Sequence, residues 1–215
     1  MHHDKLIRSV KVPCRIILVA AMILASSTSA RAASEVPANL MVRIVLAAVA
    51  YDHSIESRFG DEIKITVAGD NQRAAEIEQA LRAFSKKKLA GRPISVTRAD
   101  VEKAKETTPN ILFFAESLHA DNEKWASWCQ TNQVTCVSAD QKGVEAGIAL
   151  AVEMTAAGRP KLLINLESAQ AAGSKFSGQV LRLARIIEGS KRSLYFHYSV
   201  PTMHAYLNAI LSADA

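Results

Sequence analysis

Two cysteines, Cys129 and Cys136, are the residues of this sequence whose type and spacing most readily do chemistry. They stand seven positions apart in WCQTNQVTCV and could ligate a metal, form a redox pair, stay as buried thiols or form a disulfide. A tetrahedral zinc site needs two further ligands, and no nearby His or Cys pair supplies them. A redox dithiol more often has the C-x-x-C spacing. The choice among the remaining interpretations depends on the compartment in which the chain folds.

The other reactive side chains form no recognisable catalytic or metal-binding set. In YDHS, Tyr51–Ser54, an acid, an imidazole and a hydroxyl are neighbours. Adjacent residues do not face one another on a helix, however, and a catalytic triad is assembled from distant segments. We expect Asp52 and His53 to end a helix instead. The sequence predicts no catalytic residue, cofactor or metal, and the histidines that lack metal-ligand spacing are His119, His197 and His204.

The stretch GSKFSG, Gly173–Gly178, resembles part of a phosphate-binding loop because it leads into a helix with free N–H groups. It lacks the earlier glycine of such loops. We therefore interpret it as a loop in which Ser177 caps the following helix.

The N-terminal residues 1–32 have the pattern of a secretory signal peptide. Basic residues precede the apolar run Ile16–Ala25, and a stretch of small residues follows it. Ala30-Arg31-Ala32 fits the A-x-A cleavage pattern, so we expect cleavage after about Ala32. The apolar run is well short of the roughly 20 residues that cross a bilayer as a helix.

Export would set the chemistry of the cysteines. In a bacterial setting the compartment is the periplasm, which is oxidising, and Cys14 leaves with the signal. Two cysteines then remain, an even number, which favours a structural disulfide between Cys129 and Cys136. Two free thiols and a labile redox switch stay open as alternatives.

The charge balance gives no indication of a nucleic-acid partner. The whole chain has a formal net charge of +5, but five of its 26 Lys/Arg and one of its 21 Asp/Glu lie in residues 1–32. Residues 33–215 therefore carry a formal net charge of +1. The dense basic run Ser85–Lys88 stands where a helix should end, a place that the helix dipole favours for lysine. Nucleic-acid binding needs a clustered basic surface instead.

Helix and strand periods alternate along the chain. Asn39–Arg58 is apolar enough for a largely buried helix, and Glu62–Asp70 alternates apolar with polar residues as a strand does. Asn71 can cap the helix that follows. The continuous apolar run Asn110–Ser117 predicts a strand buried on both faces. Further expected elements are a strand at Ile94–Thr97, a helix from Asp121 that buries Trp125 and Trp128, and a strand at Val134–Asp140.

A hairpin and a last helix complete the predicted fold. Gly147–Met154 and Lys161–Glu167 flank a short turn, which is typical of two antiparallel strands. A helix is predicted over Ser177–Gly189, with Leu183 facing inward and Arg185 facing solvent. Strands alternating with helices, plus one hairpin, predict a single-domain α/β sandwich with a mixed, mainly parallel sheet and flanking helices.

The stretch Gly143–Ile187 resembles the C-terminal signature of the YfiR family of periplasmic regulators. That signature has a Gly-rich entry into a strand, a hairpin, I-N-L, small residues, a Gly, a Ser-containing turn and L-L-x-L-A-R. Leu46–Asp70 is similar to the family's opening helix and first strand, and the cysteine pair resembles a disulfide found in family members. The matching positions to which we assign a structural role are Gly147, Asn165, Gly173, Ser177, Leu183 and Arg185.

The resemblance implies regulation without enzymatic activity. YfiR-like proteins are similar to a compact α/β domain that binds the periplasmic sensor region of an inner-membrane diguanylate cyclase. They repress cyclic-di-GMP synthesis and hence biofilm formation, and outer-membrane lipoproteins can sequester them. The resemblance thus implies both kinds of partner, and a homodimer is a further option. The rival interpretation is a periplasmic small-ligand binding domain resembling half of a solute-binding protein, with a pocket at the carboxyl ends of the strands.

The resemblance covers roughly residues 40–188. The predicted organisation is a signal peptide at 1–32, a YfiR-like α/β domain at 33–189 and a C-terminal extension of unknown role at 190–215, beyond the usual end of the family. A second disulfide known in some members has no cysteines here to form it, and YDHSIESR stands where the family has an aromatic-rich opening.

Overall fold

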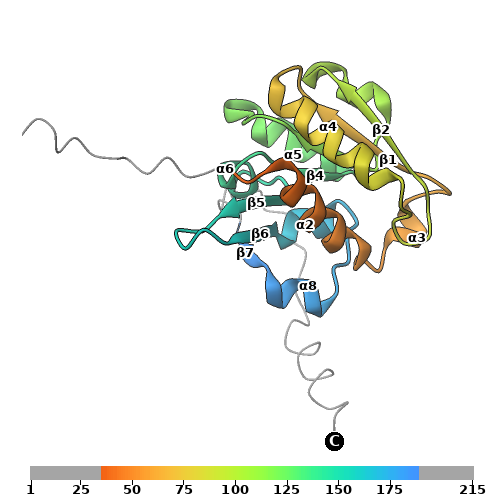
Figure 1. Cartoon of the computed structure of the whole chain (residues 1–215). Helices are drawn as coiled ribbons and strands as arrows, with labels where there is room; N and C mark the ends of the chain where they lie inside the picture. The colour runs from red at the N-terminus through yellow and green to blue at the C-terminus, as the bar shows by residue number, and fades with distance from the viewer. Residues whose placement is uncertain (1–34, 189–215) are drawn as a thin grey trace, which may run out of the picture.

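Within residues 35–188, seven strands form one sheet in the order β2-β1-β3-β4-β5-β6-β7 (Figure 1). The computed structural model describes residues 35–188, and the predicted signal peptide and C-terminal extension lie outside the described residues. Neighbouring strands are parallel except β5 and β6, which form the predicted antiparallel hairpin. The mixed, mainly parallel sheet confirms the predicted α/β class. The strands are β1 (Ile63–Ala68), β2 (Ile94–Ala99), β3 (Ile111–Phe114), β4 (Thr135–Val137), β5 (Leu150–Met154), β6 (Pro160–Asn165) and β7 (Arg185–Ile187).

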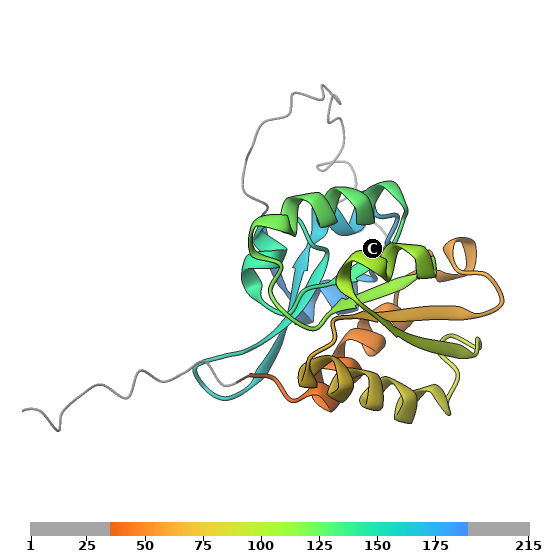
Figure 2. The same cartoon turned by 90° about the horizontal axis from the view of Figure 1, so that it is seen from above.

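Helices cover both faces of the sheet, as the view from above shows (Figure 2). Helices α2, α4 and α8 pack on one face, η1, α5 and α6 pack on the other, and α7 follows the carboxyl end of β6. No helix within residues 35–188 has the length and apolar character needed to cross a membrane. The helices are α2 (Ala38–Ala50), α3 (Ile55–Arg58), α4 (Gln72–Ser85), η1 (Val101–Thr107), η2 (His119–Asp121), α5 (Asn122–Thr131), α6 (Gln141–Glu145), α7 (Leu166–Ala171) and α8 (Gly178–Leu183).

Strand β3 is apolar at every position because both of its faces are buried. Ile111 and Phe113 point into the core under α2 and α4, whereas Leu112 and Phe114 point into the core under α5. This alternation follows from the two-residue period of a strand. It confirms the prediction of a strand buried on both faces.

Two predicted helix caps are present. The side chain of Asn71 accepts a hydrogen bond from the amide of Ala74 at 2.8 Å, at the start of α4. The side chain of Ser177 accepts one from the amide of Val180 at 3.5 Å, at the start of α8. Each cap gives an acceptor to an amide that has no partner within the helix.

The predicted helix over Ser177–Gly189 is wrong beyond Leu183. Ala184 is extended, and Arg185–Ile187 form β7, which pairs in parallel with β6. A longer helix would leave the backbone groups of β6 without partners at the edge of the sheet, and two successive isoleucines suit a strand. Leu183, predicted to face inward, is 74% exposed.

The predicted disulfide joins the last turn of α5 to β4. Cys129 and Cys136 are bonded, with their Cα atoms 6.2 Å apart, and both side chains are buried. They lie in the core that contains Trp125, which is also buried, whereas Trp128 packs against this core only partly buried. The disulfide therefore fixes the turn between α5 and β4 against the core that contains Trp125.

Reduction of this disulfide should lower the free energy of unfolding by about 2–3 kcal/mol, because the bridge restricts the unfolded chain by closing a short loop. Urea unfolding followed by circular dichroism, with and without dithiothreitol, measures the change. The Cys129→Ala/Cys136→Ala variant is the control and should not respond to the reductant. Equal midpoints for the oxidised and reduced protein would contradict a stabilising role for the bridge.

Candidate functional site

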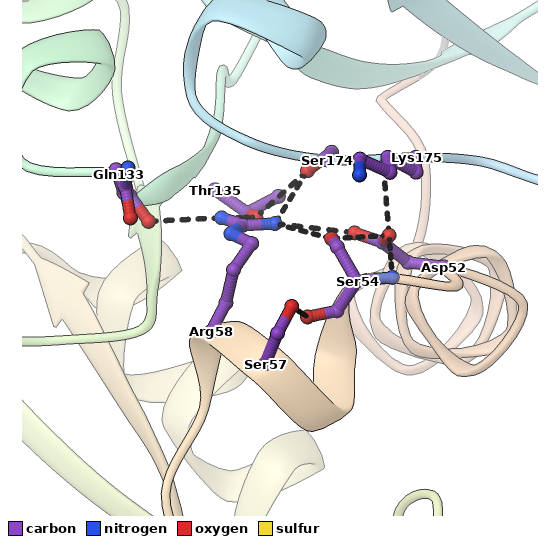
Figure 3. A network of polar contacts seen from close by, with 8 residues as sticks. All are labelled: Asp52, Ser54, Ser57, Arg58, Gln133, Thr135, Ser174 and Lys175. Atoms are coloured by element: carbon purple, nitrogen blue, oxygen red, sulfur yellow. Dashed lines mark hydrogen bonds and ion pairs between the residues drawn. The ribbon is translucent and has the colours of Figure 1, made fainter.

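The segment that follows α2 carries a buried ion pair (Figure 3). Nη1 of Arg58 lies 3.1 Å from Oδ2 of Asp52, and the two side chains are only 6% and 1% exposed. The other carboxylate oxygen of Asp52 accepts hydrogen bonds from the amide and hydroxyl of Ser54 and from the amide of Lys175. As expected, Asp52 and His53 lie just past the end of α2, but the predicted helix breaks there and α3 is separate.

The guanidinium of Arg58 also reaches two segments that are distant in sequence. Nη1 donates to the hydroxyl of Ser174 at 2.8 Å, in the loop before α8. Nη2 donates to the carbonyl oxygen of Gln133 at 2.8 Å and to the hydroxyl of Thr135 at 3.0 Å. Both of these residues lie in the turn that the disulfide closes. One side chain thus joins three parts of the chain.

The electrostatics of this network favour a structural role. Burial lowers the pKa of Arg58 from its ordinary value, and the negative charge of Asp52 opposes that shift. Asp52 is buried and is bound by Arg58 and by three further donors, one of which is the hydroxyl of Ser54 at 2.6 Å. The imidazole of His53 is exposed. The YDHS cluster therefore builds an ion pair, and its acid, imidazole and hydroxyl are not arranged as a triad.

The two glycines of the family-like motif stand where a side chain would not fit. Gly173 has a φ of +85°, and a Cβ at this position would lie 3.1 Å from Nε of Arg58. Gly147 has a φ of +105°, and a Cβ there would lie 3.1 Å from Cβ of Ala126. Positive φ and close approach together explain glycine at both positions.

The polar residues of the motif connect neighbouring elements. The buried side chain of Asn165 caps α7 by accepting from the amide of Ser168, and its Nδ2 donates to the carbonyl oxygen of Val144 at 2.9 Å. Arg185 donates from Nη2 to Oε1 of Gln141 at 2.7 Å and forms an ion pair with Glu153. These contacts tie α6 to the last three strands.

An apolar groove of about 550 Å³ lies between α2 and α8, above β6. Two of the three exposed large apolar residues of the described part of the chain line it. Tyr51 and Leu183 line the groove at 54% and 74% exposure. Ile186, 43% exposed, pairs with Ile164 and so faces the same side of the sheet. The lining residues are Ile44, Ala47, Ala48, Tyr51, Thr155, Arg159, Pro160, Lys161, Leu162, Val180 and Leu183.

The buried ion pair sets the distance between the walls of this groove. The amide of His53 donates to the carbonyl oxygen of Lys175, and the amide of Ser177 donates to the carbonyl oxygen of Tyr51, both at 3.0 Å. These bonds flank the bridge between Asp52 and Phe176. They hold the end of α2 beside the start of α8. The polar network thus lies behind the groove and positions its two helical walls.

A second hollow, of about 450 Å³, lies past the carboxyl ends of β3 and β4, and polar and charged residues surround it. This is the end of the sheet at which the rival interpretation expects a small ligand. Within residues 35–188, no group of three or more His, Cys, Asp or Glu side chains could hold a metal ion. The residues that line this second hollow are His119, Asp140, Gln141, Lys142 and Glu145.

Sequence reasoning missed the two residues that matter most here. Arg58 was missed although Asp52 stands only six positions before it, because its partners Ser174, Gln133 and Thr135 lie 75 to 116 positions away in sequence. The sequence predicts that Leu183 faces inward, because the apolar spacing of α8 continues into β7 and suggests one longer helix. The exposed isoleucine of β7 could have been found only from the strand pairing.

A family model described as DUF4154, YfiR/HmsC-like, matches residues 39–185. Comparison with curated protein sequences gives no match. One similar solved structure is a conserved domain protein from Vibrio cholerae O1 biovar El Tor strain N16961 (TM-score 0.49, 12% identity, covering 71% of this chain and 60% of that one). Another is the ABC domain in complex with L-Trp from Streptococcus pneumoniae (0.47, 13%, 70% and 62%). The chain thus spans less than two thirds of each of these structures.

Replacing Arg58 should destabilise the protein strongly, because it leaves the carboxylate of Asp52 buried without its counter-charge. We expect Arg58→Met to lower the free energy of unfolding by about 3–5 kcal/mol. The double variant Arg58→Met/Asp52→Asn removes both charges and should recover part of that loss. Urea unfolding of both variants measures the difference. If the single and double variants were equally unstable, the loss would come from packing and not from the unpaired charge.

Proposed function

We infer the function from two facts: this chain belongs to the YfiR/HmsC-like family, and it carries an exposed apolar groove. We propose that it is an exported, non-enzymatic regulator that acts by binding the periplasmic sensor region of an inner-membrane diguanylate cyclase. Binding represses cyclic-di-GMP synthesis and hence biofilm formation. An outer-membrane lipoprotein that sequesters the regulator is its second proposed partner.

The groove is the observation that carries this proposal. A soluble domain gains nothing in folding from a leucine that stays in water, and an exposed apolar patch of this kind marks a site of association. Tyr51, Leu183 and Ile186 supply such a patch from three different elements. Arg159 and Lys161 stand at the rim of the groove. The fitting partner surface is therefore apolar at its centre and acidic at its edge.

The chemistry of the nearest polar residues supports binding over catalysis. The Asp52–Arg58 pair is buried, and its charges neutralise one another. An enzyme of this size would need an acid, a base or a nucleophile that reaches a cavity with room for a substrate. The residues that line the groove are mainly aliphatic, with Thr155 and two cations as its polar groups besides the hydroxyl of Tyr51.

The signal-peptide pattern and the disulfide support an exported, periplasmic location. The A-x-A pattern at residues 30–32 is typical of signal-peptide cleavage. A disulfide between buried cysteines is the usual state in an oxidising compartment. We accordingly propose that residues 33–189 form the working regulatory domain.

Placing a charge in the groove, at Leu183, or on the same side of the neighbouring strand β7, at Ile186, should weaken binding to the sensor region. We expect Leu183→Asp and Ile186→Asp each to reduce the affinity about tenfold or more, since each removes apolar area that the complex would bury. Because both side chains are exposed, the unfolding midpoint should stay close to that of the wild type. Isothermal titration calorimetry with the purified sensor region measures the affinity, and the cellular cyclic-di-GMP level should rise in the same variants.

The matched control is Gln170→Glu, which adds one negative charge at an exposed position of α7, outside the groove. It should bind the sensor region as the wild type does. Unchanged binding of the two groove variants would move the contact to another face. Binding of a small ligand that depends on Lys142, with no sensor binding at all, would favour the rival interpretation.

A further inference from the structure

We propose that the apolar groove between α2 and α8 binds the chain's own C-terminal segment, residues 190–215, within the same molecule. This goes beyond the proposed function, since it assigns an occupant to the groove in the free protein. The position of the groove, the composition of the segment and the charges of both support this assignment.

The chain leaves the described fold at the end of β7, which runs parallel to β6, the strand whose first residues line the groove. Helix α8 forms one wall, β7 follows it after Ala184, and Glu188 is the last described residue. Ile186 of β7 lies on the groove side of the sheet and is exposed. The segment therefore begins within a few residues of an apolar surface that the rest of the fold leaves uncovered.

The length of chain between β7 and the apolar part of the segment does not limit its reach. Residues 189–202 span up to roughly 45 Å when extended. The six residues of α8 cover only about 9 Å at the rise of an α-helix. A connection this short gives an effective concentration in the millimolar range, so even weak contacts suffice to fill the groove.

The segment has the composition that the groove requires. Its apolar residues recur at intervals of three and four, the spacing of one apolar face on an amphipathic helix. Three of the four tyrosines of the chain belong to it, Tyr195, Tyr198 and Tyr206. The residues with the three-and-four spacing are Met203, Tyr206, Leu207, Ile210 and Leu211.

Charge in the groove favours the apolar part of the segment as occupant. The two cations of residues 190–215, Lys191 and Arg192, lie in the connection, and residues 203–215 contain no Lys or Arg and one acidic residue, Asp214. Arg159 and Lys161 are among the residues that line the groove. A second copy of the folded domain would bring the same two cations against them, whereas residues 203–215 bring no cation.

The segment is also a feature of this chain beyond its family match, which ends at residue 185. An apolar segment and an uncovered apolar groove, joined by a short connection, both lose contact with water when they pack together. Since the proposed function places the sensor region in this groove, the segment would have to leave before that partner binds.

Hydrogen exchange followed by mass spectrometry on residues 33–215 tests the inference without any partner. The variant Leu207→Asp/Ile210→Asp should speed amide exchange at least about tenfold in α8 and in the second half of α2, because these walls lose their cover. Conversely, Leu183→Asp should speed exchange in residues 203–211. Exchange in residues 129–136, around the disulfide, should stay unchanged and shows that the fold is intact.

Two controls add the same charge without touching the apolar contacts. Asn208→Asp lies between the apolar positions of the segment, and Gln170→Glu lies on α7; both should leave exchange at wild-type rates. Unchanged exchange in both test variants would overturn the inference. Protection of the groove that grows with protein concentration would also overturn it, because a second molecule would then supply the occupant. Neither result depends on the sensor region, so the proposed function is judged separately.

Discussion

The burial of one arginine organises the functional face of this molecule. A guanidinium removed from water is costly unless its charge is paired and its N–H groups meet acceptors. Both Nη groups of Arg58 meet this demand through Asp52 beside it, Ser174 before α8 and the residues Gln133 and Thr135, whereas its buried Nε has no partner within the described residues. Since these acceptors belong to three separate segments, the segments must lie together for the pair to be buried at all.

Two other features depend on this arrangement. The disulfide fixes the turn that supplies the carbonyl of Gln133. A covalent bond in the core around Trp125 thus supports the hydrogen bond from Arg58 to that carbonyl. The loop from Gly173 to Ser177 is held against the end of α2, and the short helix α8 begins where that loop ends. An isolated helix of six residues is not stable in water. Its position comes from the cap, the bridge to Asp52 and the apolar contacts of Val180.

Structural features that depend on residues close together in sequence could be predicted, whereas those that depend on contacts between distant segments could not. The run through β3, the caps at Asn71 and Ser177 and the cysteine pair each show a pattern within a few residues. For Arg58 only the nearby Asp52 is local, and its other acceptors, Ser174, Gln133 and Thr135, are brought near by the fold. Residues 184–187 continue a helical spacing, yet Arg185–Ile187 form a strand because β6 needs a neighbour. The prediction that Leu183 faces inward was wrong for the same reason. The groove that Leu183 lines was therefore not predicted.

Polar and apolar groups have different roles in the groove, which explains why it can be exposed and still have a defined shape. Apolar contacts are non-directional, so a patch made of Tyr51, Leu183 and Ile186 alone would have no fixed shape. Hydrogen bonds and ion pairs are directional, and here they lie behind the surface, where burial keeps water from competing with them. The buried network therefore determines the geometry of the site, and the exposed side chains provide the affinity. The proposed binding of a partner in this groove would need this combination, because the partner would be recognised by shape as well as by burial.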